Sequence, residues 1–129
     1  MLNRREFGLA AMTGGAVAAL SSGAAQAASQ PMMSLNVLYP NHEGARFDFD
    51  YYRNTHIPLA MKVMKATSVM LIEGVPNGTT APPYAMVAHF RFPSADALQA
   101  AVANPAMADV RADIPKFTDI TPVIMLGKT

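Results

Sequence analysis

The order of strand-like and helix-like segments is the feature that most restricts the folds open to this chain. Residues 84–92 (YAMVAHFRF) alternate like a half-buried strand, and a helical pattern introduced by Ser94 follows. The predicted elements, in chain order, are strand 33–39, helix 48–66, strand 68–75, strand 84–92, helices 95–104 and 106–114, and strand 118–126. This β-α-β-β-α-β order predicts an α+β domain with a four-stranded antiparallel sheet in the ferredoxin-like arrangement.

The third predicted strand indicates that the two faces of this sheet differ. Such a sheet carries its helices on one face, so the other face needs a different cover. The apolar set, expected under the helices, is Tyr84, Met86, Ala88, Phe90 and Phe92. The opposite set, Ala85, Val87, His89 and Arg91, mixes apolar with ionisable groups. That mixture predicts a surface partly buried against a second subunit, with room left for a pocket.

The N-terminal segment is typical of an export signal rather than of a folded domain. Arg4 and Arg5 precede an apolar run over residues 7–20, and Ala-Gln-Ala at 25–27 matches a cleavage site. Paired arginines of this kind resemble a twin-arginine signal. We therefore expect residues 1–27 to be removed and residues 28–129 to form the domain, in the periplasm or outside the cell. The alternatives are a retained membrane anchor and a disordered alanine-rich tail.

Charge and cysteine content exclude several classes of function. The chain has 10 Lys and Arg against 9 Asp and Glu, and without Arg4, Arg5 and Glu6 eight of each sign remain. A neutral domain with no basic block is not expected to bind nucleic acid, and no second apolar run could span a membrane. The absence of cysteine excludes disulfides, thiolate catalysis and cysteine-ligated metals. A small domain without disulfides would gain stability from a shared surface in a homodimer.

The segment FDFDYYRNTHIPLAMK, residues 47–62, combines acids, tyrosines and a histidine at helical spacing. Asp48 is predicted to cap the helix, Phe47 and Tyr52 to form a hydrophobic staple, and Pro58 to kink the helix. Asp48, Tyr52 and His56 are spaced four apart and so share one helix face, with Tyr51 one residue away.

This spacing gives a catalytic and a structural interpretation of the same helix. In the first, His56 is a general acid or base, the hydroxyl of Tyr51 or Tyr52 orients or protonates the substrate, and Asp48 helps to bind it. In the second, Asp48 only caps the helix, Tyr52 only packs, and His56 binds a carbonyl group that Pro58 leaves free.

Two further histidines are candidates for substrate binding. His89 and Arg91 share the presumed interface face, where they could bind a carboxylate, phenolate or enolate, and Glu73 could join them. The alternative is a solvated or interfacial pair. His42, in the loop after the first strand, could close over the pocket or could simply be exposed.

Three stretches resemble the EthD family, named from ethyl tert-butyl ether degradation. They are LYPNHEGARFDFDYYRNTHIPLA at 38–60, PPYAMVAHFRFPSADALQAA at 82–101 and DIPKFTDITPVIMLGK at 113–128. The resemblance implies a dimeric α/β barrel, in which two ferredoxin-like sheets pack face to face. Members are commonly labelled reductases and placed with oxidoreductases, and some are thought to be dehydratases. The family motif falls here on Asp48, Tyr51, Tyr52, His56, Pro58 and Leu59.

Cofactor motifs are not evident in the sequence. The three histidines lack a short ligand spacing, and no G-x-G-x-x-G, Walker A or nucleophile-elbow motif occurs. Met61 and Met64 could bind copper, although filling of the core explains them more simply. Haem remains an alternative by analogy with related dimeric barrels that use one axial histidine.

Two functions fit these observations. The first is an exported enzyme, an oxidoreductase or a dehydratase-like proton-transfer enzyme, that acts on a small apolar organic compound in a dimer pocket. A partner oxidoreductase is a candidate to work with it. The second is a non-catalytic accessory protein of a catabolic pathway, which binds or passes on such a compound.

Overall fold

The computed structural model describes residues 31–129, and the export signal predicted at residues 1–27 lies outside them. Four strands form one antiparallel sheet in the order β2-β3-β1-β4. Their bounds are β1 Met33–Pro40, β2 Ser68–Glu73, β3 Tyr84–Phe92 and β4 Val123–Lys128. This topology confirms the predicted α+β, ferredoxin-like fold, with Pro122 just before an edge strand, where the missing N–H of proline is tolerated.

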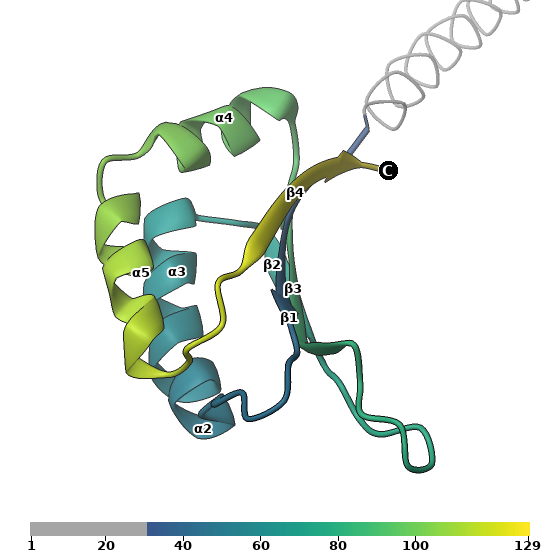
Figure 1. Cartoon of the computed structure of the whole chain (residues 1–129). Helices are drawn as coiled ribbons and strands as arrows, with labels where there is room; N and C mark the ends of the chain where they lie inside the picture. The colour runs from purple at the N-terminus through teal and green to yellow at the C-terminus, as the bar shows by residue number, and fades with distance from the viewer. Residues whose placement is uncertain (1–30) are drawn as a thin grey trace, which may run out of the picture. The chain divides into compact units, whose positions relative to one another are not determined.

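The helices all lie on one face of the sheet (Figure 1). They are α2 Phe49–Tyr51, α3 Ile57–Met64, α4 Ala95–Ala103 and α5 Met107–Asp113, and a 3-10 turn at Ile114–Lys116 follows α5. No helix within the described residues is long and apolar enough to cross a membrane.

A π-helical turn, Tyr52–His56, joins α2 to α3 where the sequence predicted a kink. The N–H of Ile57 bonds the carbonyl of Tyr52, five residues earlier, and Pro58 has no N–H to continue the α-helical ladder. The helix therefore absorbs the proline by widening one turn, and His56 lies at the end of that turn.

The start of this helical segment is stabilised as the sequence predicted. The Asp48 carboxylate accepts a hydrogen bond of 3.1 Å from the backbone N–H of Tyr51. The rings of Phe47 and Tyr52 lie 5.1 Å apart, which is the expected staple. Phe117 packs edge-on against both of these rings, so the staple is part of the aromatic core.

The strand register separates a covered face from an open one. Tyr39 pairs with Met86, Val37 with Ala88, and Leu35 with Phe90, and this apolar side lies under the helices. On the opposite side, Asn36 pairs with His89, as the sequence alternation required. No element of residues 31–129 covers that second face in Figure 1. Its large exposed apolar side chains are Met70, Ile72, Val123 and Met125, each between 52% and 59% exposed.

Candidate active site

An apolar cavity of about 250 Å³ lies between the covered face of the sheet and the helices. β1, β3, α3 and α5 supply most of its walls. The lining residues are Leu35, Val37, Tyr39, Tyr52, His56, Met64, Phe90, Val102, Met107, Val110, Arg111, Ile114, Pro122 and Ile124. The cavity belongs to a single protomer and lies across the sheet from the face where the sequence analysis expected a pocket.

His56 is the buried histidine of this cavity. The π turn directs its ring inward, and only 4% of the residue is exposed. Its Nδ1 atom lies 3.0 Å from Oδ2 of Asp113 at the end of α5. Burial lowers the pKa of His56, and the hydrogen bond to Asp113 partly opposes this effect. The ring is therefore neutral at pH 7.

Asp113 is held as a carboxylate by several neighbours. The Tyr51 hydroxyl donates a hydrogen bond of 2.7 Å to Oδ1, and Nζ of Lys116 lies 3.6 Å from the same atom. Burial tends to raise the pKa of Asp113, but the hydrogen bonds from His56 and Tyr51, together with electrostatic attraction from nearby His56 and Lys116, outweigh it and leave the pKa lowered. An ionised Asp113 requires the neutral His56 ring to carry its proton on Nδ1, so Nε2 keeps a lone pair.

The two adjacent tyrosines have different positions, which the sequence could not distinguish. Tyr52 lines the cavity, and its ring stacks on His56 with centroids 5.5 Å apart. Burial strongly raises the pKa of Tyr52 and of Tyr39, so both hydroxyls in the cavity wall stay protonated. Tyr51 does not line the cavity and acts instead on Asp113. Asp48 is also outside the lining, and its observed contact is the helix cap.

His89 and Arg91 lie on the open face, away from the cavity. Nδ1 of His89 is 2.6 Å from Oδ1 of Asn36. The Asn36 amide nitrogen donates to Oγ of Ser34 and to the carbonyl oxygen of Met125, so its oxygen is the acceptor for a His89 Nδ1–H. The predicted pairing of His89 and Arg91 on one face is therefore observed, but that face is separate from the cavity.

Glu73 does not join that face, so the suggested grouping with His89 is wrong. Its register partner is Met86, on the covered side of the sheet, and its carboxylate pairs with Arg53 at 2.6 Å. Alternation along β2 gives the reason, because Glu73 falls on the side opposite to Met70 and Ile72.

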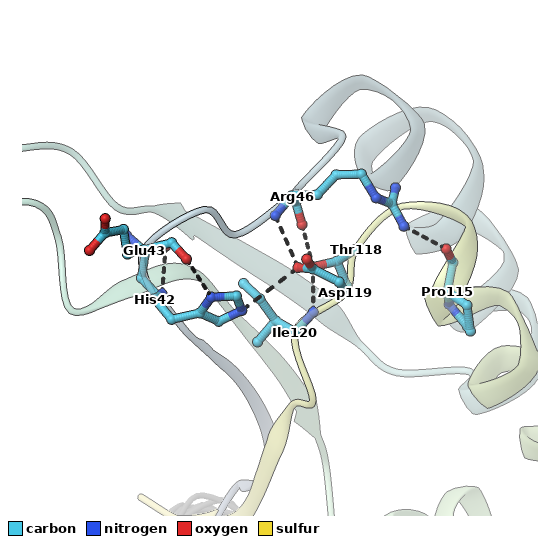
Figure 2. A network of polar contacts seen from close by, with 8 residues as sticks. His42, Glu43, Arg46, Pro115, Thr118, Asp119 and Ile120 are labelled. Carbon is cyan, nitrogen blue, oxygen red and sulfur yellow. Dashed lines mark hydrogen bonds and ion pairs between the residues drawn. The ribbon is translucent and has the colours of Figure 1, made fainter.

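His42 lies beside Asp119 and does not line the cavity (Figure 2). Nδ1 of His42 is 3.1 Å from the carbonyl oxygen of Glu43, and Nε2 is 3.8 Å from Oδ1 of Asp119. The observed partners of His42 are thus surface groups, and the ring does not close over the cavity in this conformation.

The network around His42 ties the loop after β1 to the segment after α5 (Figure 2). The Arg46 guanidinium donates to the carbonyl oxygen of Pro115 at 2.8 Å, and its backbone N–H donates to Asp119 at 3.0 Å. The Thr118 hydroxyl donates to the Arg46 carbonyl oxygen at 2.6 Å. These bonds anchor the chain just after Asp113, and so they help to fix its carboxylate beside His56.

Metal and haem binding receive little support from the site. Among residues 31–129 there is no group of three or more His, Cys, Asp or Glu side chains placed to hold a metal ion. Met64 is buried in the cavity wall and Met61 packs against the core, which supports the core-filling interpretation. A cavity of about 250 Å³ is smaller than the roughly 300–1,000 Å³ sites of drug-sized ligands, so the larger haem does not fit.

The sequence analysis missed Asp113 and Arg111, both on α5. The available signal was the helical spacing of Met107, Val110, Arg111 and Ile114, which lie three and four residues apart and all line the cavity. The pairing of Asp113 with a histidine 57 residues away had no local signal.

Comparison with known proteins agrees with this architecture. Residues 43–121 match the EthD domain. An EthD-like protein from Ralstonia eutropha JMP134 is 30% identical, with a TM-score of 0.69 over 76% of this chain and 91% of that one. An ethyl tert-butyl ether degradation (EthD) family protein from Bacillus halodurans C-125 is 24% identical, with a TM-score of 0.61 over 76% and 98% of the two chains. Among curated proteins no sequence matches this chain.

Proposed function

This chain belongs to the EthD family, and we propose that it is a proton-transfer enzyme that binds a small apolar organic molecule beside His56. The observation that carries the proposal is a histidine–carboxylate pair in the wall of an apolar cavity. A neutral histidine with an ionised partner is equipped to accept a proton and to stabilise the resulting imidazolium.

The proposed step uses the two nitrogens of His56 differently. Nε2 removes a proton from a C–H or O–H group of the substrate, and the electron pair of the broken bond stays on the substrate. Asp113 binds Nδ1–H throughout and stabilises the positive ring. Return of the proton to another substrate atom gives an isomerisation, whereas its delivery to a departing hydroxyl group gives water and a dehydration.

Tyr52 and Tyr39 are suited to hold an oxygen atom of the substrate. Their raised pKa values keep both hydroxyls protonated, and because the two hydroxyls bond one another, one proton of the pair remains to donate to the substrate. A donor in an apolar wall stabilises negative charge that develops on oxygen more strongly than water does. We assign Tyr51 a positioning role, because it contacts Asp113 and not the cavity.

A homodimer that pairs two open sheet faces is part of this proposal. Four apolar side chains on that face are more than half exposed, and their burial against a second subunit would be favourable. Each protomer would keep its own cavity, and the dimer would support the sheet that forms the cavity wall. His89 and Arg91 then belong to the interface rather than to the substrate site.

The test uses 5-nitrobenzisoxazole, a neutral compound whose ring opens to a coloured phenolate when a base removes its C–H proton. The full chain is assayed by absorbance together with His56→Gln, which retains polarity but removes the base. We expect His56→Gln to lower the rate of ring opening roughly 10²–10⁴-fold, which is the contribution that a placed histidine typically makes.

The matched control is His89→Gln, the same change on the opposite face of the sheet. It is expected to leave the rate unchanged, since His89 does not line the cavity. Equal rates for the wild type and His56→Gln, with both proteins folded by circular dichroism, would reject His56 as the base.

A non-catalytic binding protein is the second candidate, and the composition of the cavity favours it. Ten of the fourteen lining residues are apolar, which suits retention of a hydrophobic compound without reaction. Ligand binding that is intact in His56→Gln, together with no proton transfer by the wild type, would support this function.

We further propose that the protein acts after twin-arginine export, and this rests on Arg4, Arg5 and the cleavage pattern at 25–27. Cell fractionation of the wild type and of a variant with both arginines changed to lysine tests it. Retention of only the variant inside the cell supports export, and equal distribution contradicts it.

A further inference from the structure

Arg111 is a permanently charged side chain in the wall of an otherwise uncharged cavity. The remaining lining residues are ten apolar side chains, two protonated tyrosines and the neutral His56. Within residues 31–129, no ion pair or side-chain hydrogen bond engages the Arg111 guanidinium. Its charge is therefore available to a ligand.

The position of Arg111 on α5 distinguishes it from an ordinary surface arginine. Met107 lies four residues before it and Ile114 three residues after it, and both line the same cavity, as does the adjacent Val110. α5 packs beside α3 (Figure 1), and Met64 of α3 also lines the cavity. Arg111 is exposed, so it lies at the rim of the cavity, whereas His56 is buried in the wall.

The nearby carboxylate of Asp113 does not neutralise this arginine. Asp113 is bonded to His56 and Tyr51, and its cationic neighbour is Lys116 at 3.6 Å. Two residues apart on a helix, Arg111 and Asp113 point in different directions. α5 thus places the cation Arg111 at the cavity, and it orients the proposed base His56 through Asp113.

We propose that Arg111 binds an anionic group of the ligand, so that the substrate is a small, largely apolar molecule with one carboxylate or comparable oxyanion. The anion-binding role of Arg111 does not depend on the proposed function. Only the description of the bound molecule as a substrate rests on it. Arginine suits the role because its planar donors match the two oxygens of a carboxylate.

The volume of the cavity sets the size of the apolar part. A dry cavity of about 150 Å³ in another protein binds benzene. The cavity here, at about 250 Å³, accommodates a single substituted ring or an aliphatic chain of similar volume. The ring would contact the apolar walls while the anion stays at the rim beside Arg111.

Such binding would assist proton removal by His56. Loss of a proton from the carbon next to a carboxylate leaves its electron pair as an enolate and increases the negative charge on the oxygens. A fixed guanidinium stabilises that added charge. Arg111 would therefore determine both which molecule binds and how it lies relative to the base.

The test compares benzoate with benzamide, a neutral molecule of nearly the same shape. Affinities for the full chain are measured by calorimetry and by ¹H–¹⁵N chemical-shift changes. We expect benzoate to bind at least roughly tenfold more tightly, as a charge-assisted bidentate pair allows. Arg111→Met, which keeps an unbranched apolar stem but removes the guanidinium group, is expected to remove the preference.

Arg91→Met is the matched control, because Arg91 is an exposed arginine on the opposite face of the sheet. It is expected to keep the preference for benzoate. The inference is overturned if wild type binds neither probe, if it binds both equally, or if Arg111→Met keeps the preference.

The inference and the proposed function can fail separately. An Arg111-dependent preference for benzoate, with equal ring-opening rates for wild type and His56→Gln, supports the anion site and rejects the enzymatic role. A His56-dependent rate without that preference rejects the anion site alone.

Discussion

Two histidines on opposite sides of the same sheet are held through the same ring atom but by different partners. His56, 4% exposed, has its Nδ1 atom 3.0 Å from the carboxylate of Asp113. His89, half-buried on the open face, has its Nδ1 atom 2.6 Å from the amide oxygen of Asn36. In both cases the geometry fixes the tautomer and leaves Nε2 without a protein hydrogen bond among residues 31–129.

The partner determines what each histidine can do. A carboxylate stabilises the imidazolium that forms when Nε2 accepts a proton, whereas a neutral amide gives much less stabilisation. The surroundings of the two rings also differ. His56 lines an apolar cavity, whereas His89 lies among exposed apolar side chains of the open face. This contrast supports the proposed chemistry at His56 and the proposed subunit association around His89.

The largest effect is expected when the His56–Asp113 pair is changed into a histidine–amide pair like that of His89 and Asn36. Asp113→Asn gives His56 an amide partner like that of His89, and it is expected to lower the rate of ring opening roughly 10²–10⁴-fold, because the imidazolium loses its counter-charge. The 5-nitrobenzisoxazole assay measures this effect. Asn36→Asp is the control and should not change the rate; a full rate in Asp113→Asn would show that the carboxylate is not needed.

The open face is tested by placing a charge within it. Met125→Glu is expected to weaken a homodimer roughly 10²–10³-fold, because burial of an unpaired carboxylate costs several kcal/mol. Sedimentation of the full chain over a range of concentrations measures the change. Val75→Glu, a charge at a 70% exposed position after β2, should have no such effect. A wild type that stays monomeric at high concentration would remove the basis for this interface.

A smaller effect is expected when the support of the carboxylate is removed. Tyr51→Phe deletes the hydroxyl that donates to Asp113 at 2.7 Å, and the pKa of Asp113 should rise while the ring-opening rate falls by less than about tenfold. Rates measured from pH 4 to pH 8 and a carboxyl ¹³C titration report the two changes. Tyr84→Phe, an exposed tyrosine of β3, serves as the control. An unchanged carboxyl titration would contradict the positioning role.

The smallest change expected is a pH dependence of stability from His56. Burial lowers its pKa in the folded chain, so between that value and the ordinary value of about 6.5 the unfolded chain binds more protons. The free energy of unfolding should therefore decrease as pH falls from above 6.5 towards the folded pKa. Urea denaturation at several pH values should show this decrease in the wild type and a weaker one in His56→Gln. Parallel curves would argue against a lowered pKa.

The sequence predicted those features that depend on neighbouring residues. The cap at Asp48, the staple of Phe47 on Tyr52 and the alternation of β3 are contacts or directions set within a few residues, and all three are present. The sequence predicted where Pro58 would disturb the helix but not that a π turn would form there. A π turn and a kink both accommodate a missing N–H, so the sequence does not choose between them.

The sequence by itself determined the family, the order of the elements and the two unlike faces of the sheet, since these follow from local periodicity and short motifs. Only the tertiary structure decided the site. The approach of Asp113 to His56 spans 57 residues and depends on how α5 packs against α3. The same packing creates the cavity on the covered side, selects Tyr52 over Tyr51 for its wall, and brings Arg111 to its rim. Contacts between distant segments are set by the packing of whole elements, which no single stretch of sequence encodes.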